Sequence, residues 1–193
     1  MKAIIFYSQI NGFFYCKLLK NYKKKCAGGN IVNTQTAKQF EGCTHITGSL
    51  RININNKTDE EELYSLRNIA VIKGYLEISQ SLITSLNFFQ NLKEIKGKLI
   101  KQKFSLVISN NENLAELWDS TNIKINKKRI SIRGNSKLCA NVIKKFLTTY
   151  YPLDATEKNI SQSNNGDLAI CNFTNLRTRL IEISSTIRSR VIF

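Results

Sequence analysis

One short pattern of apolar residues and glycine recurs along the chain. The pattern apolar-x-x-Ile-x-Gly-x-Leu-x-Ile starts at Cys43 and again 26 residues later at Ile69. A third copy starts 23 residues further on at Leu92, and a partial fourth after another 22 at Leu114. Periods of this length are typical of solenoids, whose coils must stack because no coil buries its apolar face alone. The sequence therefore predicts a stack of similar coils.

Each coil contains a short segment in which apolar residues alternate with other residues. These segments span residues 50–52, 76–78, 106–108 and 130–132. Such alternation is typical of strands with one buried face. The middle residues are therefore expected side by side on the outer face of one parallel sheet: Arg51, Glu77, Val107 and Ser131. Lys101 breaks the pattern in the third copy, so we expect an extra turn there and a strand that restarts at Phe104.

The residues between the strands predict tight corners. The repeat glycines Gly48, Gly74 and Gly97 are expected where the chain turns between two short strands and a Cβ atom does not fit. Leu86, Phe89 and Leu92 follow each other at helix-like spacing in one connection. A group of asparagines is expected to satisfy backbone groups at a turn: Asn110, Asn111 and Asn113.

Residues 59–66, in another connection between strands, resemble a short capped helix. The last coil of the stack needs a cover, because it otherwise exposes an apolar face. A terminal helix over the last coil is predicted by Val142, Ile143 and Phe146. Residues 148–167 are polar and are expected to form a loop that returns to Cys171.

At these residues the chain resembles the receptor L domain, the module paired in the extracellular halves of the insulin and epidermal-growth-factor receptors. The segments that carry the resemblance are 42–52, 72–78, 89–97, 104–108, 113–118 and 135–139. The resemblance implies a β-rich α/β fold, a single right-handed β-helix similar to a leucine-rich-repeat solenoid and capped by short helices. It divides the chain into a poor leader or N-terminal extension (1–25), the L-type domain (26–171) and a basic C-terminal tail (172–193).

The five cysteines stand at positions that do not form a C-x-x-C pair, so the usual zinc and redox spacing is absent. Spacing alone leaves every pairing open. The resemblance implies two disulfides, Cys26–Cys43 at the start of the solenoid and Cys139–Cys171 at its end. Cys16 is then unpaired, or bonded to another chain.

The cysteines and three Asn-x-Ser/Thr tripeptides favour an extracellular or secreted location. The predicted glycosylation acceptors are Asn56, Asn159 and Asn172. The first residues begin like a signal peptide, but the polar stretch 8–12 interrupts the apolar run, so a signal peptide is not convincing. No run approaches the roughly 20 apolar residues of a membrane span. We therefore expect no transmembrane segment in this chain, which fits a secreted protein or the ectodomain part of a membrane protein.

The chain is strongly basic, with 29 Lys and Arg against 14 Asp and Glu and a net charge of +15. Such a balance raises nucleic acid or an anionic membrane as partners. The lysines are dispersed, however, with only short runs such as residues 23–25 and 144–145. This dispersal favours a solvated basic surface over a dedicated nucleic-acid footprint.

Residues that invite a catalytic or ligand-binding interpretation have simpler structural explanations. His45 lies two residues from Cys43, but a disulfide-bonded cysteine cannot act as a nucleophile. The acidic run 59–62 suits the start of a helix better than a cation site. Trp118 belongs to a repeat corner and is expected to pack in the core. We therefore expect no enzyme activity, cofactor or metal.

The sequence favours a non-enzymatic extracellular module that recognises a protein or peptide ligand across its parallel sheet. The candidate binding face consists of the outward positions Arg51, Asn53, Glu77, Ser79, Val107, Ser109, Ser131 and Arg133. Two alternatives stay open at this point. One is a structural or vestigial L-domain protein without a specific ligand, and the other is a basic nucleic-acid-binding protein.

Overall fold

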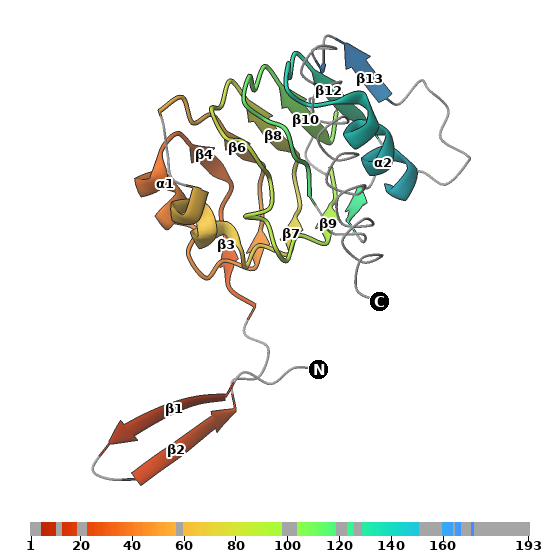
Figure 1. Ribbon diagram of the computed structural model, residues 1–193. Helices are drawn as coiled ribbons and strands as arrows, with labels where there is room; N and C mark the ends of the chain where they lie inside the picture. Colours follow the sequence, from red (N-terminus) through yellow and green to blue (C-terminus); the bar gives the residue numbers. More distant parts are fainter. Residues whose placement is uncertain are drawn as a thin grey trace, which may run out of the picture.

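A computed structural model describes residues 5–10, 13–18, 23–56, 60–97, 104–118, 123–125, 129–150, 160–163, 165–166 and 171. Two parallel sheets form the walls of the domain, and short helices lie at its ends (Figure 1). The fold is therefore mixed α/β with few helices. An antiparallel hairpin, β1 (Ile5–Ile10) with β2 (Phe13–Leu18), precedes the two sheets in the chain.

The six-stranded sheet runs in the order β4, β6, β8, β10, β12, β13, and every neighbouring pair is parallel. Its strands are β4 (Gly29–Ile31), β6 (Leu50–Ile52), β8 (Leu76–Ser79), β10 (Leu106–Ser109), β12 (Ile130–Arg133) and β13 (Ile160–Ser163). The four strands predicted from alternation are thus β6, β8, β10 and β12. Successive coils place their strands next to one another, as the repeat predicts.

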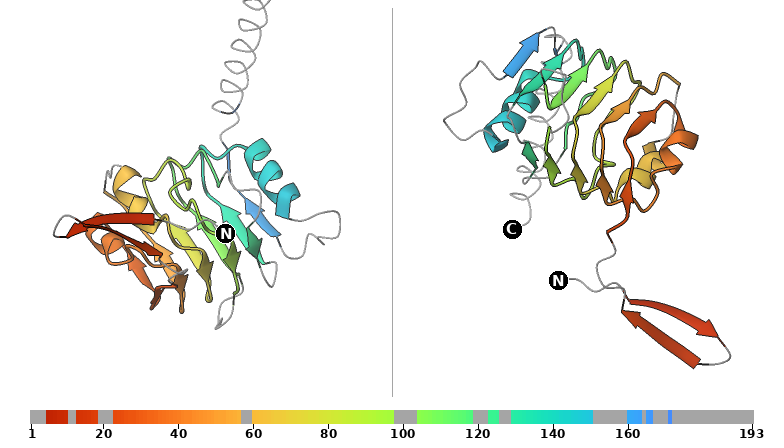
Figure 2. Two further views of the ribbon diagram at one scale, coloured as in Figure 1. Left: turned by 90° about the horizontal axis from the view of Figure 1, so that it is seen from below. Right: turned by 180° about the vertical axis from the view of Figure 1, so that it is seen from behind.

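The five-stranded sheet is also parallel and takes one short strand from each of five coils. Its strands, in spatial order, are β3 (Lys25–Cys26), β5 (His45–Ile46), β7 (Val71–Ile72), β9 (Glu94–Ile95) and β11 (Lys124–Ile125). Figure 2 shows from two further sides that the two sheets form different walls of the stack.

The core consists of columns of aliphatic side chains that run from coil to coil. One column joins Leu50, Leu76, Leu106 and Ile130, which are paired in register and fully buried. A second column on the same sheet joins Ile31, Ile52, Ile78, Ile108 and Ile132. Burying one such side chain contributes roughly 1.5 to 3 kcal/mol. The stack is therefore stabilised mainly by contacts between neighbouring coils.

The corner between the two sheets is closed by glycine, as predicted. The backbone N–H of Gly74 donates to the carbonyl oxygen of Gly48 (2.8 Å), and that of Gly97 donates to Gly74 (3.0 Å). A Cβ atom on Gly74 would lie 2.7 Å from the carbonyl carbon and oxygen of Gly48. Real side chains do not tolerate such contacts, so only glycine lets consecutive corners stack this closely.

Buried amide side chains connect the coils at the opposite end of the strands. The Oδ1 atom of Asn111 accepts from the backbone N–H of Ser81 (3.0 Å), and its Nδ2 group donates to Ile78 (3.1 Å). Asn135 repeats this arrangement one coil later, accepting from the N–H of Asn111 (3.2 Å) and donating to Ile108 (3.1 Å). We call the side chains of Ser81, Asn111, Asn135 and Asn165 the asparagine ladder.

The predicted asparagine turn is confirmed for one of its three members. Asn111 is fully buried within the ladder. Asn110 is exposed and adopts a positive φ of 56°, which asparagine tolerates better than most residues. Asn113 accepts a hydrogen bond from the Nζ group of Lys137 (2.7 Å). The ladder members Asn135 and Asn165 are not recognised from the sequence.

Helices cover both ends of the stack (Figure 1). At the first end lie α1 (Thr34–Lys38), capped by the Asn33 side chain, and the 3₁₀ helix η1 (Glu60–Leu66). At the last end lies α2 (Ala140–Tyr150), which buries Ile143 and Phe146 as predicted. The described part of the acidic run thus begins η1 rather than an α-helix.

Three predictions of local structure need correction. Residues 148–167 are not all loop, because α2 continues to Tyr150 and β13 pairs with β12. The strand β13 contains one isoleucine among polar residues, so its sequence does not show the alternation that predicts a strand. It forms because β12 offers a free strand edge to which this segment pairs. Leu86, Phe89 and Leu92 are buried as expected, but they lie in turns rather than in a helix. Lys101 lies outside the described residues, and the strand that follows it begins at Leu106.

Candidate functional site

The outward residues of the six-stranded sheet form one continuous row. Arg51 pairs in register with Glu77, Glu77 with Val107, and Val107 with Ser131. The predicted alignment of these four residues is therefore confirmed. The row continues to Asn30 on β4 and to Ser161 on β13.

The expected exposure of this row is wrong for part of it. Val107 and Ser131 of this row expose only 9% and 2% of their surface, and Ser109, two residues further along β10, exposes 5%. They are short side chains on interior strands, where neighbours stand on both sides at about 4.8 Å. Arg51 and Arg133 are exposed, and the remaining members of the candidate binding face, Asn53, Glu77 and Ser79, are half-buried. Four accessible or half-accessible members of the candidate face thus lie on or next to β6 and β8, whereas Arg133 stands apart at the end of β12.

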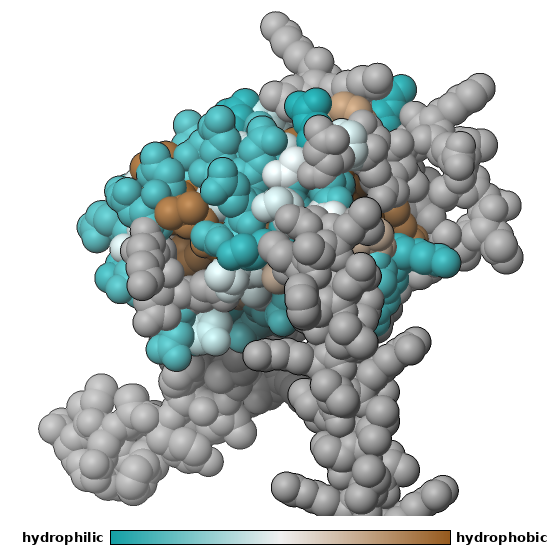
Figure 3. Space-filling model, turned by 45° about the horizontal axis from the view of Figure 1, so that its top comes forward, coloured by the Kyte–Doolittle hydropathy of each residue, from teal (hydrophilic) through white to brown (hydrophobic). Residues whose placement is uncertain are grey.

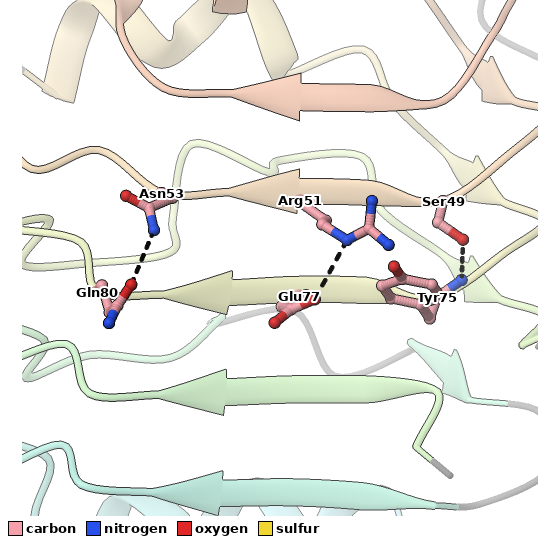
Figure 4. A network of polar contacts seen from close by, with 6 residues as sticks. All are labelled: Ser49, Arg51, Asn53, Tyr75, Glu77 and Gln80. Atoms are coloured by element: carbon pink, nitrogen blue, oxygen red, sulfur yellow. Dashed lines mark hydrogen bonds and ion pairs between the residues drawn. The ribbon is translucent and has the colours of Figure 1, made fainter. Parts of the chain in front are cut away.

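A fixed cluster of polar side chains lies on β6 and β8 (Figure 4). The Nε atom of Arg51 is 3.4 Å from the Oε2 atom of Glu77, and its guanidinium group lies over the ring of Tyr75, 5.0 Å from the ring centroid. The Ser49 hydroxyl accepts from the backbone N–H of Tyr75 (3.2 Å). A surface ion pair of this kind contributes at most about 1 kcal/mol to stability, so its main effect is to hold the arginine in one orientation.

A shallow groove of about 460 Å³ lies where these strands end. Asn53 donates through its Nδ2 group to the Oε1 atom of Gln80 (3.2 Å) at this groove (Figure 4). Leu82, which is 40% exposed, adds an apolar element to a lining that is otherwise polar. The full lining is Asn53, Asn55, Gln80, Ser81, Leu82, Asn110 and Glu112. Neither Gln80 nor Leu82 was predicted, because both follow β8, where the alternation has ended.

The surface contains little exposed apolar area. In the view of Figure 3, hydrophilic side chains cover most of the described surface, and the apolar patches are small and separate. The exposed large apolar residues in the described part are Val32, Tyr64 and Leu82. These three residues are too few and too scattered to form a broad interface that excludes water. Recognition at this surface must therefore use polar contacts.

Disulfides close both ends of the stack at the positions that the resemblance implies. Cys26 is bonded to Cys43, joining β3 to the residues before β5. Cys139 is bonded to Cys171, joining the start of α2 to the returning chain. Loops of these lengths contribute on the order of 3 to 4 kcal/mol each in the chain-entropy account. The side chain of Cys16 lies outside the described part of the structure.

Residues that suggested chemistry have structural roles in the described part of the chain. Trp118 is 7% exposed and packs between Phe89 and Phe146, with ring centroids 6.3 and 5.8 Å away. Among the described residues, no group of three or more His, Cys, Asp or Glu side chains is placed to hold a metal ion. Asn56 is exposed, whereas Asn159 and Asn172 lie outside the described residues.

His45 stands on the outward side of the five-stranded sheet. Its Nδ1 atom is 3.0 Å from the Thr44 hydroxyl. Partial burial lowers the pKa of His45 below its usual 6.5, and the charges of four nearby lysines, Lys23, Lys25, Lys96 and Lys73, lower it further. Cys43 is oxidised, so no Cys–His nucleophile pair exists here.

The lowered pKa predicts a loss of stability under mild acid. The unfolded chain takes up a proton on His45 near pH 6.5, before the folded chain does, so the free energy of unfolding falls as pH drops through this value. Urea unfolding at about pH 7.5 and about pH 5.5 measures the difference. His45→Gln should reduce this pH dependence. An unchanged dependence in the variant would show that other groups cause it.

Two parallel sheets made by stacked coils, with a disulfide at each end, define a domain of the extracellular type. The family profile "Receptor L domain" matches residues 42–150. The chain belongs to the receptor L domain family, and the domain is extracellular. Such a domain is a ligand-binding part of a receptor and is not catalytic.

Its relatives include insulin-type receptors from several animals. The chain is 34% identical to the "Insulin-like peptide receptor" of Branchiostoma lanceolatum over 169 residues, covering 83% of this chain and 12% of the relative. It is 34% identical to the "Insulin-like receptor" of Caenorhabditis elegans over 155 residues, covering 76% and 8%. It is 32% identical to the "Insulin receptor" of Xenopus laevis over 177 residues, covering 88% and 12%. The chain thus spans about a tenth of the length of these relatives. In its described residues, no helix has the length and apolar character of a membrane span.

Proposed function

We propose that this chain is a non-enzymatic ectodomain module that recognises a protein or peptide ligand across the outward face of its six-stranded sheet. The observation that carries the proposal is the Arg51–Glu77 pair, which is accessible and held in place before any ligand arrives, with the guanidinium group packed over the buried ring of Tyr75. Arginine is a common anchor of protein interfaces, and preorganisation lowers the entropy cost of binding.

The ligand class follows from the relatives and from the surface. Relatives named as receptors for insulin-like peptides support a peptide of that type. The groove beside Asn53 offers amide donors and acceptors for a peptide backbone, and Leu82 offers an apolar contact. The oxidation of Cys43 and the packing of Trp118 support a role without catalysis.

The architecture that we propose for this function is a single right-handed β-helix over residues 26–171. Parallel strands joined by a crossover are right-handed in about 98% of cases, which supports this handedness. The residues before 26 then form an N-terminal extension, and residues 172–193 form a basic tail. Glycosylation of Asn56, Asn159 and Asn172 is part of the same proposal.

Binding of insulin-family peptides to the purified, oxidised chain tests the proposal. Calorimetric titration should detect binding, and Arg51→Ala should weaken it by about tenfold or more, the loss typical of an interface anchor. Arg67→Ala is the matched control, because Arg67 is exposed beside η1 and away from this sheet.

Two results would contradict the proposal. Equal affinity in the two arginine variants would place the ligand elsewhere on the domain. Folded protein that binds no member of a panel of insulin-family peptides would favour an L domain without a peptide ligand.

A further inference from the structure

The five-stranded sheet presents a second outward face, and this face is rich in lysine. Its inward residues are Cys26, Ile46, Ile72, Ile95 and Ile125, all of which pack in or against the core. The residues before them point outward and are paired in register from coil to coil. In spatial order they are Lys25, His45, Val71, Glu94 and Lys124.

A second outward row follows the inward residues. The backbone N–H of Lys73 donates to Ile46 (2.9 Å), and that of Lys96 donates to Ile72 (2.8 Å). The parallel ladder thus extends past β7 and β9, which places Lys73 and Lys96 on neighbouring coils about 4.8 Å apart along the stack. We call Lys25, Lys73, Lys96 and Lys124 the lysine face.

His45 shows that the lysines converge through space. Four lysines act on this one imidazole, although they come from three separate parts of the sequence, around positions 23–25, 73 and 96. Glu94 is the acidic member of the outward row, and it lies 3.3 Å from the Nζ atom of Lys96. Within the described residues, Lys25, Lys73 and Lys124 have no carboxylate within ion-pair distance. The face therefore carries a concentrated positive charge.

The lysines of this face are far apart in the sequence. Lysines separated by one or two repeats look dispersed along the chain, but stacking brings them onto one wall. Part of the basic surface is therefore a clustered feature of the fold.

We propose that the lysine face binds a sulfated glycosaminoglycan chain. Cations placed on several successive coils along the stack suit a linear polyanion, and an extracellular domain meets sulfated polysaccharides on cell surfaces and in the matrix. The face has no aromatic platform among its described outward residues, which disfavours single-stranded nucleic acid. Its short strands supply no helix to enter a DNA groove. Val71 is too small an apolar element to anchor the face in a membrane.

This second ligand is independent of the first. The two sheets form different walls of the stack (Figures 1 and 2), so a polysaccharide on one leaves the other accessible. The proposal therefore stands whether or not the six-stranded sheet binds a peptide.

Heparin titration with two matched double variants tests the proposal. Lys25→Gln with Lys73→Gln removes two exposed, unpaired cations from the lysine face, whereas Lys38→Gln with Arg67→Gln removes two exposed cations beside α1 and η1. Counterion release makes each lost contact cost several-fold in affinity, so the first variant should bind heparin about tenfold more weakly or worse. Its slope of log affinity against log salt should also become shallower by about one to two. The control should change little.

The pKa of His45 reports whether heparin binds at the lysine face itself, because heparin bound elsewhere on the domain would not offset the charges of these nearby lysines. Bound sulfates offset the field of the lysines, so saturating heparin should raise the pKa of His45, measured by NMR. The control double variant should show the same rise. An unmoved His45 pKa at saturation would place heparin elsewhere and overturn the proposal.

Two further outcomes would also overturn it. Equal losses of heparin affinity in both double variants would show that binding depends on the net charge of the domain and not on the lysine face. Duplex DNA that binds as tightly as heparin, with the same dependence on Lys25 and Lys73, would show a general polyanion surface. Thermal unfolding of each variant verifies that the fold is retained.

Discussion

Replacing Asn111 with alanine should lower the free energy of unfolding by about 3 to 5 kcal/mol, because three coils lose hydrogen bonds at once. The change leaves the backbone N–H of Ser81 and the carbonyl of Ile78 without their partner in the interior. It also removes the donor that Asn111 offers to the Oδ1 atom of Asn135 (3.0 Å). Each unsatisfied buried group costs about 1 to 3 kcal/mol.

Asn113→Ala is the matched control, since Asn113 lies two residues away and its Oδ1 atom accepts a single hydrogen bond, from Lys137, within the described part of the chain. Its replacement should cost less than about 1 kcal/mol. Denaturant unfolding of both variants gives the comparison. A similar small loss in both would mean that the asparagine ladder does not hold the coils together.

Replacing Leu76 with alanine should destabilise the fold by about 2 to 5 kcal/mol, the range for large-to-small changes in a core. Leu76 is fully buried between Leu50 and Leu106 in the central column of the six-stranded sheet. Glu77→Ala on the outward side of the same strand should cost well under about 1 kcal/mol, because its ion pair with Arg51 is solvent-accessible. Equal losses in urea melts would contradict the assignment of inward and outward faces.

The strands of the six-stranded sheet were predictable where the repeat is strong. Leu50, Leu76, Leu106 and Ile130 alternate with non-core residues in every coil, so both the strands and their register follow from the sequence. The strands β3, β4 and β13 were not predicted. They are formed by pairing with neighbouring coils, and their own residues do not alternate enough to indicate them.

The candidate site was predictable in position but not in detail. Alternation places Arg51 and Glu77 on the outward side, and the structure agrees. Alternation cannot show that the Arg51 guanidinium group lies over the Tyr75 ring. Nor can it show that Ser109 and Ser131 are buried, because burial depends on the length of the side chains on the neighbouring strands. The lysine face was missed for a similar reason. Its members are separated by one or more repeats and become neighbours only after the coils stack.

The domain thus presents two chemically different walls. The six-stranded sheet carries a mixed polar cluster with both charges, which suits a folded peptide. The five-stranded sheet carries mainly lysine, which suits a polyanion.

Site-specific photo-crosslinking measures most directly whether the six-stranded sheet is the ligand face. A photoreactive phenylalanine analogue replaces Asn53 beside the polar cluster in one variant, and Thr47, on the outward side of the five-stranded sheet, in the other. With an insulin-family peptide bound, position 53 should cross-link to the peptide and position 47 should not. Cross-linking from position 47, with none from position 53, would contradict the assignment of the peptide to the six-stranded sheet.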